Sequence, residues 1–259
     1  MKKLLFALVL LASATVFGQS PFDGTWMVKL DTAKLPSKPD TYLLNKTTYE
    51  CLTCIPKVTV KANGTDQKVT GHPYYDTISV RVINASSVEI TQKKEGKVMS
   101  TETQTVSSDG KTLTDKGTDT TGTKPVTWET TATRVSGGPA GAHALSGSWR
   151  TEKINSVSNS GLFVTFQSTG NGIKMSDQNG RSYDARFDGN DYPVLGDPGH
   201  TRVWVKRIAP RMIEETDKRG GKIVGVYRMT VSTDGNSISI EYNDKEHETT
   251  TTYTMERKS

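Results

Sequence analysis

The chain has 259 residues, a formal net charge of +5 and a hydrophobic fraction of 33%. So mild a positive charge argues against a protein that binds nucleic acid. Beyond the N-terminal segment, no apolar stretch approaches the roughly 18 residues needed to span a bilayer.

The first segment, "MKKLLFALVLLASATVFGQS", places Lys2 and Lys3 before an apolar run that ends in small residues. This three-part layout is typical of a secretory signal peptide. It predicts a signal peptide over residues 1–18, with cleavage after Gly18 as the first choice and after Ala14 as the second. We therefore expect the mature protein in the periplasm or outside the cell.

An internal repeat organises the rest of the chain. A shift of 125 residues aligns 61–110 with 186–235 without a gap, and seventeen of the fifty positions are identical. Such self-similarity indicates two copies of one structural unit. We expect one unit over 19–135, a small-residue linker over 136–144 and a second unit over 145–259.

Each unit is rich in short segments typical of antiparallel β-strands. These segments carry many β-branched residues, partly alternate apolar and polar positions, and are joined by turn sequences such as Asp109-Gly110 and Asp234-Gly235. The clearest are 77–83, 87–93, 97–107, 202–208, 222–232 and 237–242. Closing such a meander into a barrel removes its unpaired edges. The sequence thus predicts an all-β protein of two tandem antiparallel up-and-down barrels.

The only two cysteines, Cys51 and Cys54, lie in "YECLTCIPK". The repeat aligns this "CLTC" with "SDQN" at 176–179, a hairpin turn, and the ends of a β-turn are close enough for a disulfide. A redox pair would need a helix after a strand, and none is predicted. A zinc site would need two more ligands, and the four histidines show no paired spacing; they are His72, His143, His200 and His247. We favour a disulfide across the turn, with redox and metal roles as alternatives.

Two further shared features have ordinary structural explanations. A Gly-x-Pro sequence occurs at Gly71 and Gly196, near His72 and His200, and favours turn geometry because the histidines do not align. A Glu-x-Thr-x-Lys pattern also recurs, and because alternate residues share one face of a strand it forms a polar stripe. That stripe is expected to face outward; its residues are Glu89, Thr91, Lys93, Glu214, Thr216 and Lys218.

Each unit begins with a Gly-x-Trp strand and ends near an arginine, and this arrangement resembles the lipocalin and fatty-acid-binding superfamily. The resemblance implies that a tryptophan closes one end of each barrel and that the arginine packs across it. The matching residues are Gly24 and Trp26 with Arg134, and Gly147 and Trp149 with Arg257. The chain is most similar to tandem lipocalin-like secreted bacterial proteins, although a Thr-Asp-Tyr turn motif and a flanking helix are missing.

The resemblance implies a non-catalytic protein that binds a small, largely apolar ligand in one or both barrels. The second unit offers the bulkiest candidates for the lining, which are Phe163, Phe166, Trp204, Tyr227 and Met229. No catalytic, phosphate-binding or zinc motif is present, so the sequence predicts no cofactor and no metal. Two other functions remain open: a structural or interaction module with filled barrels, and a small-barrel enzyme, which converging titratable groups inside a barrel would favour. The oligomeric state also remains open.

Overall fold

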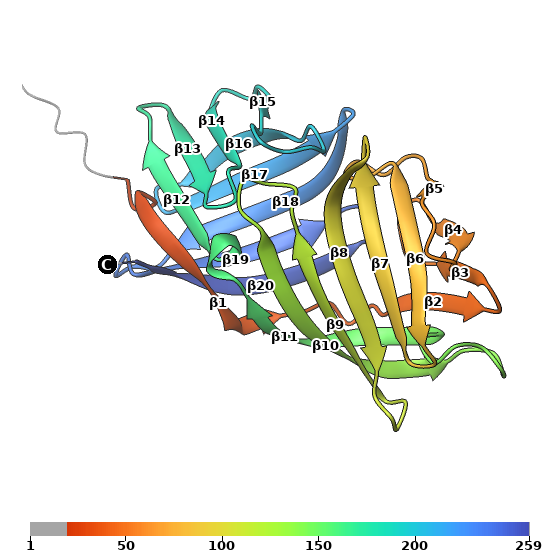
Figure 1. Ribbon diagram of the computed structural model, residues 1–259. Coiled ribbons are helices and arrows are strands. Elements are labelled where there is room, and N and C mark those ends of the chain that lie inside the picture. Colours follow the sequence, from red (N-terminus) through yellow and green to blue (C-terminus); the bar gives the residue numbers. More distant parts are fainter. Residues whose placement is uncertain (1–19, 259) are drawn as a thin grey trace, which may run out of the picture.

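The computed structural model describes residues 20–258. Within them, regular structure consists of β-strands and one 3₁₀ turn at Asn159–Gly161. The strands form two antiparallel sheets of ten strands each, which lie side by side as two barrels (Figure 1). The prediction of an all-β protein with two antiparallel barrels is confirmed. The predicted signal peptide, residues 1–18, lies outside the described residues.

We call the two sheets the first and the second barrel. The first barrel has the strand order β4 (Val58–Lys61), β3 (Thr48–Cys51), β2 (Asp40–Asn45), β11 (Gly147–Val157), β10 (Val126–Gly137), β9 (Thr112–Asp119), β8 (Lys97–Val106), β7 (Ser87–Lys94), β6 (Thr77–Asn84) and β5 (Gln67–Lys68). The second barrel has the order β14 (Ser182–Arg186), β13 (Gly172–Asp177), β12 (Phe163–Ser168), β1 (Gly24–Lys34), β20 (Thr249–Arg257), β19 (Ser237–Asp244), β18 (Lys222–Val231), β17 (Met212–Arg219), β16 (Arg202–Ala209) and β15 (Tyr192–Pro193).

Each sheet curls until its two edges nearly meet. In the second barrel, Ser182 and Leu195 exchange two backbone hydrogen bonds of 3.1 and 2.8 Å. In the first barrel, Asn63 bridges to Arg81, and the Gly64 N–H donates to the Val80 carbonyl at 2.8 Å. These bridges pair backbone groups that would otherwise be left open at a sheet edge.

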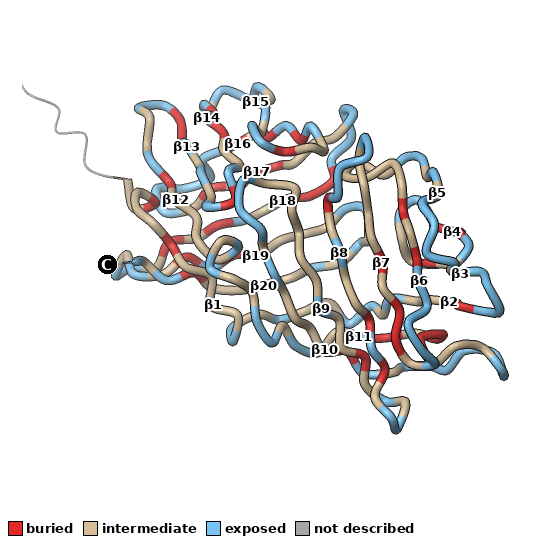
Figure 2. Tube along the Cα trace, viewed as in Figure 1, coloured by how far each residue is buried: buried red, intermediate tan, exposed pale blue. Residues whose placement is uncertain are grey.

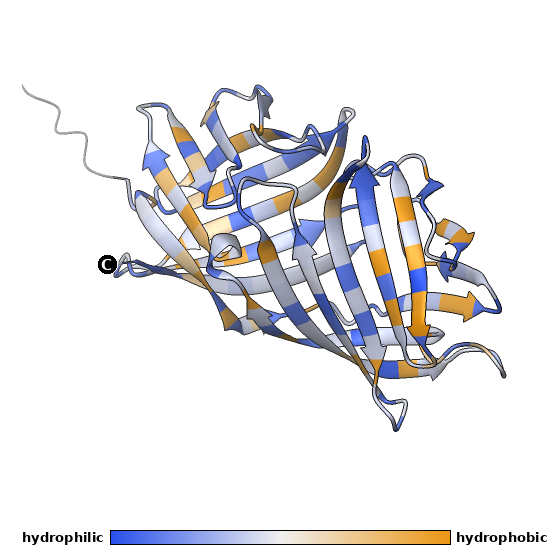
Figure 3. Ribbon diagram, viewed as in Figure 1, coloured by the Kyte–Doolittle hydropathy of each residue, from blue (hydrophilic) through white to orange (hydrophobic). Residues whose placement is uncertain are grey.

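Period-two alternation explains which side chains fill the interiors. In β6, Ile78 and Val80 are buried while Arg81 is exposed; in β16, Val203 and Val205 are buried. Buried segments are accordingly spread along the strands, and exposed segments concentrate in the loops (Figure 2). Hydrophobic and hydrophilic positions follow one another along β6 and β7 (Figure 3). Each barrel therefore has its own apolar core.

The first strand of each repeat lies in the barrel of the other repeat. β1 pairs with β12 and β20, so Trp26 lies opposite Val164 and Arg257. β11 pairs with β2 and β10, so Trp149 lies opposite Asp40 and Arg134. In Figure 1, β1 accordingly runs beside β12 and β20, away from β2, which follows it in the chain. The structure thus differs from the expected division, which kept each Gly-x-Trp strand in its own unit.

The tryptophan–arginine pairs are exchanged in the same way. The Arg134 guanidinium lies 3.9 Å from the centroid of the Trp149 ring, and that of Arg257 lies 4.1 Å from the Trp26 ring. The expected pairs were Trp26 with Arg134 and Trp149 with Arg257, so both partners were wrong. The type of contact is as expected, because in each barrel an arginine packs on a buried indole, which combines a cation–π contact with apolar burial.

Chain connectivity explains the exchange. Both Gly-x-Trp strands carry the same closing residues, so each can fit either barrel. Arg134 donates hydrogen bonds to the carbonyls of Ala144 and Ser146, at 2.6 and 2.7 Å, and so holds the short connection after β10. β11 consequently folds back beside β10 in the first barrel.

The two cysteines lie in the hairpin between β3 and β4. Their sulfur atoms are 2.05 Å apart, and Cys51 pairs with Val58 across the hairpin. The prediction of a Cys51–Cys54 disulfide across a turn is confirmed.

Candidate functional site

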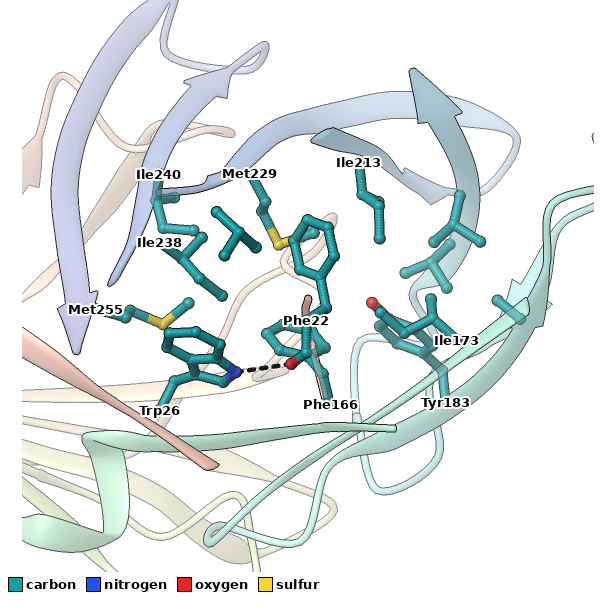
Figure 4. Close-up of a cluster of buried hydrophobic side chains, with 14 residues drawn as sticks. Phe22, Trp26, Phe166, Ile173, Tyr183, Ile213, Met229, Ile238, Ile240 and Met255 are labelled. Atoms are coloured by element: carbon teal, nitrogen blue, oxygen red, sulfur yellow. Dashed lines mark hydrogen bonds between the residues drawn. The ribbon is translucent and has the colours of Figure 1, made fainter. Parts of the chain in front are cut away.

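A cavity of about 290 Å³ lies inside the second barrel. One part of its wall is apolar and sulfur-rich, with Phe166, Met229 and Met255 among its residues; Figure 4 shows these side chains converging beside Trp26. Another part is polar, and its residues are Asp177, Arg181, Asp197, Thr201, Glu215, Asp217 and Arg219, together with Tyr227, Tyr242 and Tyr253. Such a mixed lining is typical of small-molecule sites, although the volume is at the small end of their range.

Strand β17 supplies the charged part of this wall. Its alternate residues Ile213, Glu215, Asp217 and Arg219 share one face, because successive strand residues point to opposite sides. Ile213 is fully buried in the core, whereas Asp217 and Arg219 lie further along the same face, so the face changes from apolar to charged. The hydrophobic core thereby fixes the orientation of the two carboxyls.

Glu215 and Asp217 form a coupled pair of carboxyl groups. Glu215 is 9% exposed, and the Tyr183 hydroxyl donates to its Oε2 atom at 2.5 Å. Burial, together with the charge of Asp217, raises the pKa of Glu215 to about 8. Burial also raises the pKa of Asp217 to about 6. The pair therefore holds protons at pH values where exposed carboxyls are ionised.

A tyrosine of the first barrel completes the cavity. Tyr74, in the loop before β6, lines it, and its ring lies 5.3 Å from the Arg219 guanidinium. Its ring also packs on Gly199, where an added Cβ would lie 2.9 Å from the ring carbons. The Lys94 ammonium donates at 2.7 Å to the carbonyls of both Pro73 and Pro198, which joins the two Gly-x-Pro loops. The site is thus shared between the two barrels.

Three of the five predicted ligand-binding residues line the cavity. They are Phe166, Tyr227 and Met229. Phe163 lies on the other face of β12, where the Lys258 ammonium is 5.6 Å from its ring centroid. Trp204 lies on the outer face of β16, between the buried Val203 and Val205. Phe163 and Trp204 were predicted because their side chains are large. The alternation of side chains along each strand places both of them on the outer face, so the prediction is wrong for these two residues.

The other shared sequence features are structural. In the Glu-x-Thr-x-Lys stripes, Glu89 pairs with Arg81 at 2.9 Å and Glu214 pairs with Arg228 at 3.0 Å. The stripes lie on the strand faces opposite the core, as expected, although Thr216 is buried there beside its cross-strand neighbour Trp204. Gly71 and Gly196 have φ values of 82° and 75°, so both Gly-x-Pro sequences form the expected turns.

The interior of the first barrel also contains a pair of carboxyls. Burial and the charge of Asp115 raise the pKa of Glu102 to about 8, and burial raises the pKa of Asp115 to about 6. The Trp128 indole N–H donates to Asp115 at 3.4 Å, and its ring lies so close to Gly117 that an added Cβ would be 2.1 Å from it. Here the carboxyls are packed beneath a large aromatic ring.

Sequence reasoning missed Glu215 and Asp217, although a signal was available. In "IEETDKR" (213–219), the residues that alternate with Ile213 are Glu215, Asp217 and Arg219. Assigning Ile213 to the core would have placed all three on the inner face. The Glu-x-Thr-x-Lys pattern, which both units share, lies on the other face of the strand, and that pattern was interpreted instead of Glu215 and Asp217.

A larger groove of about 670 Å³ lies outside the barrels, between the β1–β2 connection, the disulfide hairpin and His247. Its walls are loops, and Ile55 is 46% exposed there. The Lys38 ammonium spans it to the His247 carbonyl at 2.7 Å. Asp40 also lines this groove, and burial raises the pKa of its carboxyl.

Comparisons with protein-family models, curated proteins and solved structures found no match to this chain. Over residues 20–258, no helix is long and apolar enough to cross a membrane. In that same part of the chain, no group of three or more His, Cys, Asp or Glu residues is placed to hold a metal ion.

Proposed function

We propose that the protein is an exported, lipocalin-like binding protein that holds a small amphipathic molecule in its second barrel. The observation that carries the proposal is the cavity of about 290 Å³, in which an apolar wall meets a charged one. A ligand with an apolar body and a polar end would satisfy both surfaces at once.

The apolar wall suits adaptable packing. Met175, Met229 and Met255 contribute unbranched, polarisable side chains, which adjust to irregular ligand shapes. Phe166 adds a rigid aromatic surface and packs edge-to-face on Phe22, with ring centroids 6.3 Å apart. The aromatic contact holds Phe166 in place, while the methionines, including its cross-strand neighbour Met175, leave other parts of the wall deformable.

Two features support export. The "MKKLLFALVLLASATVFG" segment has the layout of a signal peptide. The Cys51–Cys54 disulfide suits an oxidising compartment, such as the periplasm or the exterior of the cell. We expect the mature chain to begin at Gln19, which N-terminal sequencing of protein purified from its host would establish.

Binding is tested first with protein isolated from its own host. Native mass spectrometry should show a removable adduct of low mass, and the stripped protein should take it up again with a saturable affinity. Val164→Phe, which adds bulk to the cavity wall, should abolish uptake, whereas Trp204→Phe, on the outer face, should not. Circular dichroism would check that both variants fold. An absent adduct, together with no uptake of any apolar probe, would leave a structural module with filled barrels.

The carboxyl pair favours a second candidate function, acid–base catalysis. A protonated Glu215 beside an ionised Asp217 is the arrangement of a general acid and a general base. The recovered ligand decides between the two functions. A ligand that wild-type protein releases chemically unchanged supports binding alone; one that wild type converts, and Glu215→Gln does not, supports an enzyme.

A further inference from the structure

We propose that the ligand of the second barrel is a small zwitterion with an apolar tail, such as an α-amino acid with an apolar side chain. This inference rests on the proposed binding function and names the ligand class. It is carried by unpartnered buried polar atoms of both signs on residues that line the same cavity.

These atoms are concentrated around the cavity. Among residues 20–258, six buried side-chain nitrogen or oxygen atoms have no hydrogen-bond partner, and three of them belong to lining residues: Asp217 Oδ1, Arg181 Nε and Arg219 Nε. Folded proteins rarely leave such groups unsatisfied, and an exception calls for an explanation, such as a ligand. One of the three is an acceptor and two are donors.

The two carboxyls form no close ion pair with a protein cation. Within the described chain, neither Glu215 nor Asp217 takes part in an ion pair. The Tyr183 hydroxyl satisfies one oxygen of Glu215. Burial raises the pKa of Asp217, and the charge of Arg219 acts against this shift only from beyond ion-pair distance. An ammonium group donates up to three hydrogen bonds and would supply the donor that Asp217 Oδ1 lacks, with a positive charge in direct contact.

The arginines offer the complementary half of the site. Arg219 pairs with Glu246 through Nη1 at 3.1 Å, and Arg181 donates through Nη2 to Thr121 at 3.2 Å, so in both residues Nε is the unpartnered donor. A carboxylate accepts such donors in charge-assisted hydrogen bonds. A ligand with an ammonium alone would leave these two atoms unsatisfied.

The inner face of β17 presents apolar, acidic and basic side chains in succession, which suits a ligand whose apolar tail, ammonium and carboxylate branch from one carbon. Ile213 lies in the core, followed on the same face by Glu215, Asp217 and Arg219, and alternate strand residues are about 6.6 Å apart. An apolar side chain near Phe166 would place the α-ammonium by the carboxyls and the α-carboxylate by Arg219. Tyr227 and Tyr242, stacked at 4.3 Å, add aromatic surface beside the ammonium.

Isothermal titration calorimetry with three matched probes tests the inference on the full mature protein. Phenylalanine carries both charged groups, 2-phenylethylamine lacks the carboxylate, and 3-phenylpropanoate lacks the ammonium. We expect phenylalanine to bind at least tenfold more tightly than either analogue. Leucine, 3-methylbutylamine and 4-methylpentanoate form the same series with a smaller tail.

Two variants assign the groups. Asp217→Asn should reduce phenylalanine binding to the level of 3-phenylpropanoate without weakening that analogue. Arg219→Gln should reduce it to the level of 2-phenylethylamine without weakening the amine. Glu214→Gln and Lys218→Gln, on the opposite face of β17, serve as controls and should leave all affinities unchanged. If either test variant misfolds, the probe series on wild-type protein decides by itself.

Several outcomes would overturn the inference. A singly charged analogue that binds as tightly as the zwitterion in both series overturns the ligand class and leaves the proposed binding function intact. The ligand class is also overturned if protein from the host carries an apolar adduct and binds none of these probes. If neither an adduct nor probe binding is found, the inference and the proposed function fail together.

Discussion

The two barrels contain the same kinds of polar residue in different places. The second barrel carries Glu215 and Asp217 on β17, and the first carries Glu102 on β8 and Asp115 on β9. Under the repeat, Glu102 corresponds to Tyr227 and Asp115 to Ile240, so neither pair derives from the other position by position. The shared turns, tryptophans and arginines keep the same fold in both barrels, while the buried carboxyls lie at different positions.

The loops at the contact between the barrels differ as well. Tyr74 and Gly199 occupy equivalent positions of the repeat, and the tyrosine ring packs on the glycine while it lines the second cavity. Lys94 and Arg219 are also equivalent; Lys94 joins the two loops, and Arg219 lines the cavity. The first barrel therefore contributes a lining residue to the cavity of the second barrel. The two repeats share a fold, but their interiors differ.

The largest effect should come from removing the exchanged tryptophans. Trp26→Ala and Trp149→Ala should each lower the free energy of unfolding by about 3–5 kcal/mol, because each indole is fully buried. Hydrogen exchange measured by mass spectrometry should increase in β16–β19 for Trp26→Ala and in β6–β9 for Trp149→Ala. The reverse pattern would contradict the strand exchange.

A second prediction concerns pH. The pKa of Glu215 is raised to about 8 in the folded state, so the folded protein binds more protons than the unfolded chain. The stabilisation from this group is therefore full at about pH 4 and is lost as the pH rises through about 8, with a slope of at most about 1.4 kcal/mol per pH unit. Chemical denaturation should show a smaller loss of stability between pH 5 and 8.5 in Glu215→Gln than in wild type.

The pH comparison extends to the first barrel. Glu102 has its pKa raised to about 8 as well, so Glu102→Gln should flatten the same profile. The two variants should differ in ligand binding, because Glu215 lines the cavity and Glu102 belongs to the other barrel. Equal losses of ligand affinity would remove the distinction between the two interiors.

The disulfide should contribute less to the free energy of unfolding, and it should stabilise the first barrel only. Replacing Cys51 and Cys54 together by alanine should cost at most about 2 kcal/mol, because the closed loop is short. Hydrogen exchange should increase in β3 and β4 and remain unchanged in β13 and β14, the equivalent hairpin. Intact-mass analysis before and after reduction, with a gain of two hydrogens in wild type, would verify the bond in the purified protein.

The smallest effect should come from Tyr74. Tyr74→Ala should speed ligand release from the second barrel severalfold, since the variant loses a cation–π contact and one wall of the cavity, worth about 1 kcal/mol. The neighbouring Tyr75, which packs on the core of the first barrel, is the matched control. Tyr75→Ala should lower the stability of the first barrel and leave the release rate unchanged, as stopped-flow displacement would show.

The candidate site was only partly predictable from the sequence. Phe166, Tyr227 and Met229 were identified by bulk, and the cavity contains them. Trp204 was equally bulky, but its position between Val203 and Val205 turns it outward. The inward orientation of Glu215 could be predicted only after Ile213 had been assigned to the core, because the most buried residue of a strand identifies its inner face.

The sequence by itself determined the strands, the turns, the internal repeat and the disulfide, since these depend on local alternation, on residues such as Asp109-Gly110, and on cysteines three positions apart. Only the tertiary structure decided which barrel each Gly-x-Trp strand joins. Trp26 and Trp149 stand in the same Gly-x-Trp motif, and that motif by itself does not distinguish their partners. Chain connectivity around β10 and β11, and the packing of Arg134 and Arg257 on the exchanged indoles, made that choice.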